Sequence, residues 1–317
     1  MNDLINKKIY LAGHNGMVGS AIFRELQQRG YKNIITKDLT ELDLRKQSDV
    51  ENFFNETKPE VVIIAAAKVG GILANNTFRA EFLYDNLMIE ANLIHASYLN
   101  NVDKLVFLGS SCIYPKLAPQ PLKEEYLLSD YLEYTNEPYA IAKIAGIKLC
   151  ESYYRQYGCN YISAMPTNLY GPYDNFNLET SHVLPALIRK FHESKVNGND
   201  SVTIWGTGKP LREFLYVEDL ANAIVFMMES ISAKDLYEAG ITQLNVGSGK
   251  DISIADLASL VSGIVGFSGK IEYDSSKPDG TPRKLMDVSR INSLGWKYKT
   301  ELPDGIRKAY EWFLTVN

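Results

Sequence analysis

The first half of the chain alternates between two patterns of hydrophobic and polar residues. Short apolar runs, typical of buried strands, occur at residues 8–12, 33–37, 60–67, 105–108 and 161–165. Helical patterns separate them, at residues 17–29, 47–56, 79–99 and 139–157. The run at 60–67 is apolar nearly throughout, as expected for a parallel strand covered on both faces. This alternation predicts right-handed βαβ units and an α/β fold with a Rossmann-type, doubly wound parallel sheet.

The pattern loosens after Pro166. Residues 168–180 are rich in Asn, Gly, Pro and Tyr and predict a loop. Further on, a strand is expected at 202–205, with helices at 182–193, 217–229, 254–265 and 303–313. No internal repeat or low-complexity linker separates the two halves, so we expect them to share a cleft.

This organisation predicts two regions. The first is a dinucleotide-binding Rossmann domain at 1–166, with a return of the chain near 213–247. The second is a smaller α/β substrate-binding region formed by 167–212 and 248–317.

Three glycines stand where the first predicted strand passes into the first predicted helix, in Gly13-His-Asn-Gly16-Met-Val-Gly19. Glycine lets the backbone approach a pyrophosphate, and the following helix offers free N–H groups at its N-terminus. Strand, loop and helix occur in the order that a dinucleotide site requires. The second predicted strand ends at Lys37-Asp38, where Asp38 favours a free ribose 2′-hydroxyl and Lys37 a 2′-phosphate. These residue types leave NAD and NADP both open.

A Tyr-x-x-x-Lys pair, Tyr139 and Lys143, lies within a predicted helix, where positions i and i+4 share a face. A neighbouring ammonium favours the phenolate, so we expect the pKa of Tyr139 to be lowered and proton exchange with a substrate oxygen to be accessible. Ser110 and Ser111 follow the strand at 105–108, at the sheet edge where ligands bind in open α/β folds. A hydroxyl at this edge is placed to hydrogen-bond a substrate carbonyl.

Cys112 follows these serines and has several possible uses. Cysteine is commonly a small buried hydrophobe, which we expect for Cys150, whereas Cys159 falls in a turn. At the end of a strand facing a cleft, the Cys112 thiol could instead act as a base, with His182 as an acid. Spacing alone leaves packing and catalysis both open for Cys112.

Composition narrows the class of protein. The 317 residues carry a net charge of −5, which argues against a nucleic-acid or anionic-membrane surface. Three cysteines without a Cys-x-x-Cys motif argue against a disulfide framework or a zinc cluster. The N-terminus lacks the apolar core of a signal peptide, and the longest apolar run, 61–67, is too short to span a bilayer. We expect a cytoplasmic protein without a bound metal.

Longer segments of the chain resemble one enzyme family, the GDP-L-fucose synthases among the extended short-chain dehydrogenases/reductases. The resemblance rests on segments spread through nearly the whole chain, at residues 12–20, 65–72, 108–116, 136–146, 165–172 and 277–284. The Gly-Ser-Ser-Cys-Ile-Tyr-Pro and Lys-Pro-Asp-Gly-Thr segments are more specific than the Ser, Tyr and Lys shared by the superfamily. Related dehydratases have a segment similar to Thr-Asp-Glu at the position where this chain has Ser-Ser-Cys.

The resemblance implies an activity. GDP-4-keto-6-deoxy-D-mannose would be epimerised at C3 and C5 and reduced at C4 with NADPH. Cys112 and His182 would be the base and the acid of the epimerisation. In the reduction, Tyr139 would donate a proton, Lys143 would lower its pKa, and Ser110 would bind the oxygen.

The resemblance also implies binding residues. GDP-sugar would be held by Lys190, Trp205, Arg212 and Asp279. NADP(H) would be held by Ser110, Tyr139, Lys143 and His182, together with Gly13, His14, Asn15, Gly16, Met17, Val18, Gly19, Lys37, Leu108, Gly109, Pro166, Thr167, Asn168 and Leu169.

The chain differs from the family at the residues expected to contact the adenosine ribose of the cofactor. Some members carry arginine at the position of Asn15 and a second basic residue near Leu39, so Lys37 is the nearest candidate for the 2′-phosphate. The resemblance further implies a homodimer through the helices at 79–99 and 139–157. Two other functions remain as alternatives: a nucleotide-sugar 4-epimerase that retains NAD, and a non-enzymatic dinucleotide sensor.

Overall fold

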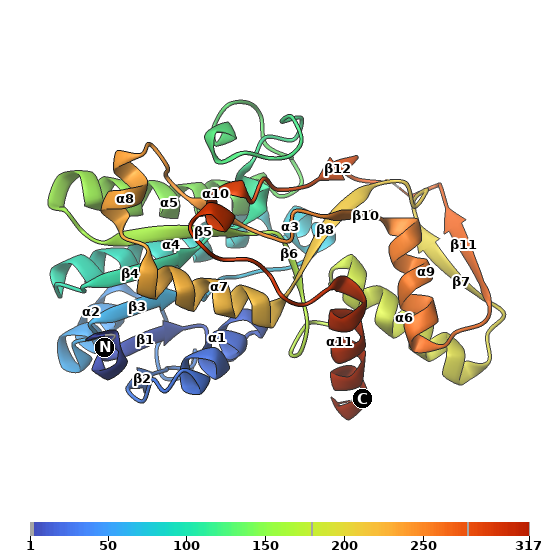
Figure 1. Cartoon of the computed structure of the whole chain (residues 1–317), viewed down its shortest axis with the longest axis horizontal. Coiled ribbons are helices and arrows are strands. Elements are labelled where there is room, and N and C mark those ends of the chain that lie inside the picture. Colours follow the sequence, from blue (N-terminus) through green and yellow to red (C-terminus); the bar gives the residue numbers. More distant parts are fainter. Residues whose placement is uncertain (1–2, 179, 278, 317) are drawn as a thin grey trace.

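A sheet of six parallel strands forms the centre of the larger part of the molecule, in the order β2-β1-β3-β4-β5-β9 (Figure 1). The computed structural model describes residues 3–178, 180–277 and 279–316. The strands are β1 (Ile9–Ala12), β2 (Ile34–Ile35), β3 (Val61–Ile64), β4 (Lys104–Leu108), β5 (Tyr161–Pro166) and β9 (Leu244–Val246). The chain order reverses between β1 and β3, so a ligand crevice is expected at their carboxyl ends.

Helices cover both faces of this sheet. On one face α1 (Met17–Gln28) packs against α7 (Val217–Ser230), and on the other α4 (Arg79–Leu99) packs between α2 (Gln47–Thr57) and α5 (Glu137–Tyr157) (Figure 1). Strands β1, β3 and β4 are buried at every position, which explains their nearly continuous apolar sequence. The predicted doubly wound sheet is confirmed.

The smaller part is built around β8 (Leu211–Tyr216), which pairs with β6 (Asn168–Tyr170), β10 (Asp251–Ser253) and β12 (Arg283–Lys284). Beside them, β7 (Ser201–Trp205) pairs with β11 (Lys270–Asp274), and helices α6 (Val183–Asn197), α9 (Ile254–Val265) and α11 (Leu302–Val316) complete this part (Figure 1). The prediction that 168–180 is entirely loop is wrong for its first three residues, because β6 extends parallel to β8. Short elements complete the chain: η1 (Asp3–Asn6), α3 (Ile72–Thr77), η2 (Ser111–Ile113), η3 (Glu124–Tyr126), α8 (Ala233–Glu238) and α10 (Ser289–Ser293).

Buried apolar side chains form two separate clusters. The larger lies between the central sheet and its helices, and the smaller between α6, α9, α11 and the strands of the smaller part. Four C-terminal residues, Met286, Val288, Ile291 and Trp296, pack in the larger cluster. The division into 1–166 with 213–247 and 167–212 with 248–317 stays a prediction. In the described part of the chain, no helix has the length and apolar character needed to cross a membrane.

Candidate active site

The glycine segment lies at the reversal of strand order, where the crevice is expected. Gly13 has φ = +88°, and a Cβ on it would lie 2.6 Å from the Ala66 backbone nitrogen, just after β3. A Cβ on Gly19 would lie 2.0 Å from the Gly13 carbonyl oxygen. Both glycines are therefore required by close backbone packing, and they bring the start of α1 against the ends of β1 and β3.

The start of α1 has the properties of a pyrophosphate site. Gly16 occupies the N-cap position without a side-chain cap, and the first turn carries no acidic residue. Free N–H groups and the positive end of the helix dipole therefore face the crevice. The Nδ1 atom of His14 is buried without a hydrogen-bond partner. These features fit the pyrophosphate of a dinucleotide.

At the ribose end, both candidate residues are engaged within the chain. Lys37 Nζ lies 2.7 Å from Glu41 Oε1. The Asp38 carboxylate accepts hydrogen bonds from the Thr40 hydroxyl at 2.7 Å and from the backbone N–H groups of Thr40 and Glu41. These bonds, the Thr40 hydroxyl first, lower the pKa of Asp38. Asp38 therefore stabilises its own turn, and Lys37 must leave Glu41 to meet a 2′-phosphate.

Six other predicted cofactor residues lie at or just after the ends of β4 and β5: Leu108, Gly109, Pro166, Thr167, Asn168 and Leu169. A Cβ on Gly109 would meet Met165 Sδ at 2.5 Å, so this turn packs tightly on β5. Asn168 Nδ2 donates to the Glu213 carbonyl oxygen at 2.8 Å, which ties the segment after β5 to β8.

The Ser-Ser-Cys turn is set by a cap. Ser110 is the N-cap of η2, and its hydroxyl accepts from the Cys112 backbone N–H at 3.4 Å. Cys112 is 7% exposed and Tyr139 half-buried. Burial raises the pKa of the Cys112 thiol, while Lys284, Ser110 and Lys143 act in the opposite direction. A hydrogen bond with Ser110 also lowers the pKa of Tyr139, so this hydroxyl faces both groups.

The expected lowering of the Tyr139 pKa is wrong for this structure. Burial raises it well above its ordinary value, and the negative charges of Cys112 and Glu90 add to the rise. Lys143 is paired with Glu90, their Nζ and Oε2 atoms being 3.6 Å apart, with both side chains almost fully buried. The ammonium lies 5.9 Å from the centre of the Tyr139 ring. Tyr139 is therefore held in the protonated form that a proton donor needs.

A second cation, Lys284 on β12, lies among the predicted catalytic groups. It lowers the pKa of Cys112 and, after burial, that of His182. His182 is the N-cap of α6, and its side chain is exposed although protein crowds it closely enough to lower its pKa.

The predicted GDP-sugar residues lie on the smaller part. Lys190 Nζ donates to the Thr203 carbonyl oxygen at 3.3 Å and lies 5.7 Å from the centre of the Trp205 ring. Lys277 Nζ lies 5.6 Å from the same ring, which is 64% exposed. This combination offers a free aromatic face flanked by cations, suited to a nucleotide.

Arg212 and Asp279 border the same region. Arg212 lies within β8 and pairs in register with Lys284 of β12. Asp279 accepts hydrogen bonds from the Thr207 backbone N–H and hydroxyl, at 2.6 and 2.7 Å. Neighbouring cations on β8 and β12 suit a diphosphate.

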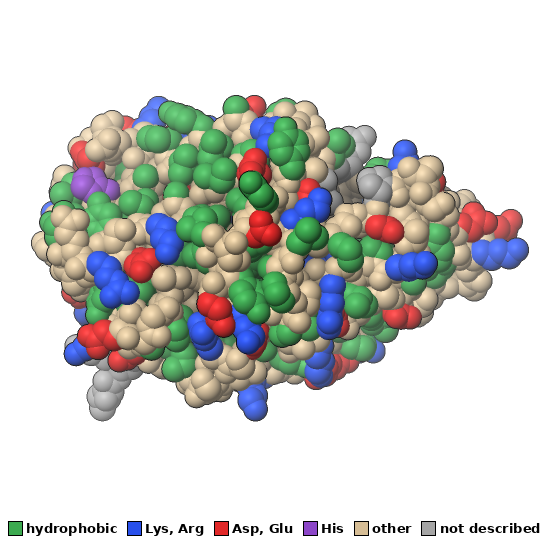
Figure 2. All heavy atoms as spheres, turned by 90° about the horizontal axis from the view of Figure 1, so that it is seen from above, with side chains coloured by type: hydrophobic (Ala, Val, Ile, Leu, Met, Phe, Trp, Pro, Cys, Tyr) green, Lys and Arg blue, Asp and Glu red, His purple; other side chains and the backbone are tan. Residues whose placement is uncertain are grey.

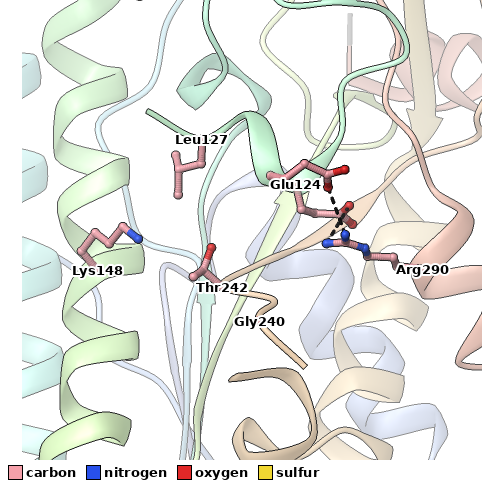
Figure 3. Close-up of a pocket in the computed structure, with 7 residues that line it drawn as sticks. Glu124, Leu127, Lys148, Gly240, Thr242 and Arg290 are labelled. Atoms are coloured by element: carbon pink, nitrogen blue, oxygen red, sulfur yellow. Dashed lines mark hydrogen bonds and ion pairs between the residues drawn. The ribbon is translucent and has the colours of Figure 1, made fainter. Parts of the chain in front are cut away.

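A half-open pocket lies away from these residues (Figure 3). It has a volume of 190 Å³ and includes Glu124, Lys148, Thr242 and Arg290, but none of the predicted site residues. Arg290 closes one side by ion pairs with Glu124 and Glu125 (Figure 3). The described residues contain no group of three His, Cys, Asp or Glu placed to hold a metal ion.

Two residues of this site, Glu90 and Lys284, have no role in the predictions from sequence. Glu90 is a lone acid on the buried stripe of α4 that includes Asn86, Leu93 and Ile94. The sequence signal for Glu90 is an acidic residue on the helix face that is otherwise buried, with Leu93 and Ile94 three and four positions further on. Lys284 had no such signal, because only the pairing of β12 with β8 brings it to the site.

Comparisons with known proteins identify the family of this chain. Residues 9–247 match the NAD dependent epimerase/dehydratase family. The chain is 58% identical to GDP-L-fucose synthase 1 of Arabidopsis thaliana over 97% of this chain and 93% of that one. It is 53% identical to GDP-L-fucose synthase of Escherichia coli over 97% of each chain. A GDP-L-fucose synthetase from Naegleria fowleri bound to NADP superposes with a TM-score of 0.87 at 28% identity, over 97% of this chain and 94% of that one. The chain belongs to the NAD dependent epimerase/dehydratase family.

Proposed function

We propose that this protein makes GDP-L-fucose from GDP-4-keto-6-deoxy-D-mannose, by epimerisation at C3 and C5 followed by NADPH-dependent reduction at C4. One observation carries the proposal: a thiol, Cys112, stands beside Ser110 and Tyr139 at the end of β4. A 4-epimerase that retains NAD needs the serine and the tyrosine but no thiol. Identities of 53 to 58% to chains named GDP-L-fucose synthase support the same product.

In the epimerisation, the C4 ketone acidifies the protons on C3 and C5. Cys112 takes a proton from one face, and His182 returns one to the other. Burial disfavours the thiolate of Cys112 and the imidazolium of His182, so both charged forms need support. Lys284 supplies it for the thiolate.

In the reduction, NADPH supplies the hydride when bound. Tyr139, protonated at neutral pH because its pKa is raised, gives its proton to the C4 oxygen. Ser110 donates a hydrogen bond to that oxygen and so polarises the ketone for both reactions. Both reactions therefore use the same polarised C4 carbonyl, and one site can catalyse them both.

The cofactor site is formed by the glycine segment, the start of α1 and the ends of β4 and β5. Gly13, Gly16 and Gly19 admit the pyrophosphate. Lys37, which follows β2 at the expected position of the adenosine ribose, is the candidate cation for a 2′-phosphate. Binding of NADPH and NADH, measured by quenching of protein fluorescence, tests this cofactor; tighter binding of NADH would contradict it.

The substrate spans both parts of the molecule. Arg212 binds the diphosphate, Trp205 and Lys190 the nucleoside, and Asp279 holds the loop beside them through Thr207. A Campylobacter jejuni GDP-6-OMe-4-keto-L-xylo-heptose reductase is 46% identical, so heptose-linked substrates are the second candidates.

The decisive experiment incubates the protein with GDP-4-keto-6-deoxy-D-mannose and NADPH in deuterated water. Deuterium at C3 and C5 of GDP-L-fucose is the expected result. Reduction without exchange would remove the epimerase half of the proposal. Cys112→Ser should lose the exchange while binding NADPH as the wild type does.

A homodimer in the cytoplasm completes the proposal. Helices α4 and α5 pack on each other and expose Tyr84, Leu99, Ile141 and Tyr157. Hydrophobic side chains gather on the broad end of the molecule (Figure 2). Light scattering of the wild type should give twice the chain mass, and Ile141→Arg should give a monomer. Three free cysteines suit a reducing compartment.

A further inference from the structure

A carboxylate is buried in the middle of α4 next to the proposed catalytic lysine. Glu90 is 1% exposed, and among the described residues neither of its side-chain oxygens has a hydrogen-bond partner of normal geometry, although Lys143 and the Gly146 backbone N–H both act to lower its pKa. Its ion-pair partner is Lys143 Nζ, at 3.6 Å. A buried ion pair gains little net stability over apolar residues of similar size, so packing alone does not account for this one.

The surroundings of Lys143 show what the carboxylate does. The ammonium lies 4.7 Å from the centre of the Phe107 ring and is almost fully buried. Burial lowers the pKa of Lys143, whereas Glu90 and, to a smaller extent, Cys112 raise it. Removal of the Glu90 charge would leave Lys143 inclined to lose its proton.

The titratable groups around the Glu90–Lys143 pair are those whose protonation would change if the Glu90 charge were removed. From α5, Lys143, Tyr139 and Cys150 face Glu90, and from η2 Cys112 faces Lys143. Of the two cations of the site, Lys143 lies beside Tyr139, its Nζ 5.9 Å from the centre of the ring, whereas Lys284 acts on Cys112 and His182. A phenolate formed at Tyr139 would therefore depend on Lys143 for a compensating charge.

We propose that Glu90 is a positioning residue for the reduction, whose carboxylate keeps Lys143 charged and held beside Tyr139. This inference rests on the proposed function. Glu90 touches neither substrate nor cofactor and makes or breaks no bond. Its effect passes through Lys143 to the phenolate that remains when Tyr139 has given its proton to the substrate oxygen.

The test compares Glu90→Gln with wild type in single-turnover oxidation of NADPH by GDP-4-keto-6-deoxy-D-mannose between pH 6 and 9. Burial raises the pKa of Glu90 to about 7, so the rates of the two proteins are compared above pH 7, where the carboxylate is charged. The rate should fall about tenfold, the effect of one pKa unit at a coupled group. The alkaline limb of the pH profile should move to lower pH, because Lys143 loses its proton earlier. Glu90→Asp, which keeps the charge, should recover part of the rate.

Two other readouts separate positioning from folding. The KM for the GDP-sugar should stay near the wild-type value, and deuterium exchange at C3 and C5 without NADPH should fall less than the reduction does, because Lys284 and Ser110 lower the pKa of Cys112 more than Lys143 does. Glu124→Gln is the matched control, because Glu124 is also buried and faces a cation, Arg290, at 3.5 Å in the other pocket (Figure 3). This control should keep the wild-type pH profile.

A double variant keeps the inference testable if the single change harms folding. Glu90→Gln should slow the reduction no further in a Lys143→Met background, and the double variant should melt at a higher temperature than Lys143→Met alone. An equal loss in both backgrounds would overturn the inference, as would an unchanged pH profile in Glu90→Gln. Absence of turnover by the wild type would instead count against the proposed function.

Discussion

Lys104 offers a quantitative test of how burial controls charge in this fold. The residue begins β4, is 3% exposed, and donates hydrogen bonds to the Ile231 carbonyl oxygen and to Asn160 Oδ1. Burial lowers its pKa from 10.5 to about 7, with a small opposing effect of Asp235. Between these pH values the unfolded chain binds a proton that the folded chain does not.

The sign follows from this difference in bound protons. Stability rises with pH wherever the unfolded state binds more protons, by up to about 1.4 kcal/mol per pH unit for one group. For a folded pKa of about 7, the gain from pH 6 to pH 9 is about 2.7 kcal/mol. Lys104→Met removes this titration, so the variant should be more stable than wild type at pH 6.

The orphaned Ile231 carbonyl offsets part of that advantage, by about 1–3 kcal/mol if it stays dry. A pocket of 330 Å³ bounded by Lys104 and Ile231 gives water access to it.

The assay is urea unfolding followed by circular dichroism at pH 6, 7, 8 and 9. The difference in free energy of unfolding between Lys104→Met and wild type should shrink by about 2.7 kcal/mol across this range. Lys234→Met, at an exposed lysine on α8, controls for the loss of one positive charge. A difference that stays constant from pH 6 to pH 9 would refute the reasoning.

Three further substitutions test packing and binding. Gly146→Ala would place a Cβ 2.4 Å from Phe107 Cζ, so we expect about 1–3 kcal/mol of destabilisation by chemical unfolding, and a slower reduction because this ring supports the lysine beside it; wild-type stability would contradict the close packing. Gly13→Ala meets the Ala66 backbone at 2.6 Å with φ = +88°, and it should weaken NADPH binding at least about tenfold, which is about 1.4 kcal/mol; unchanged NADPH titrations would show that the turn tolerates a side chain. Trp205→Ala should raise the KM for the GDP-sugar about tenfold and leave the Kd for NADPH unchanged; a matching loss of NADPH binding would argue against a nucleotide subsite there.

The sequence carried the larger part of the fold in local patterns. Strands β1, β3 and β4 are buried throughout and read as apolar runs, and α4 begins and ends at the predicted residues 79 and 99. These elements were predictable because their burial is visible in a window of a few residues. The glycine segment was equally predictable, because the spacing of its glycines indicates close backbone contacts within a single βαβ unit.

The smaller part was harder to predict for a physical reason. Strand β12 has two residues, and β6 three, and both exist because β8 offers them a partner far along the chain. Such strands carry no period of their own. The raised pKa of Tyr139 was missed for a related reason: it comes first from burial and then from Cys112 and Glu90, and these surroundings depend on the packing of α5 against η2 and α4.

The position of β9 at the edge of the central sheet has a consequence for synthesis of the protein. Strand β5 ends at Pro166, but its outer neighbour begins only at Leu244, after β6, β7, β8 and α7 have been made. Until residue 246 leaves the ribosome, the edge of β5 presents unpaired backbone groups to solvent and to other chains. The nascent protein therefore passes through a long interval of aggregation risk, in which chaperones that cover open sheet edges should bind it.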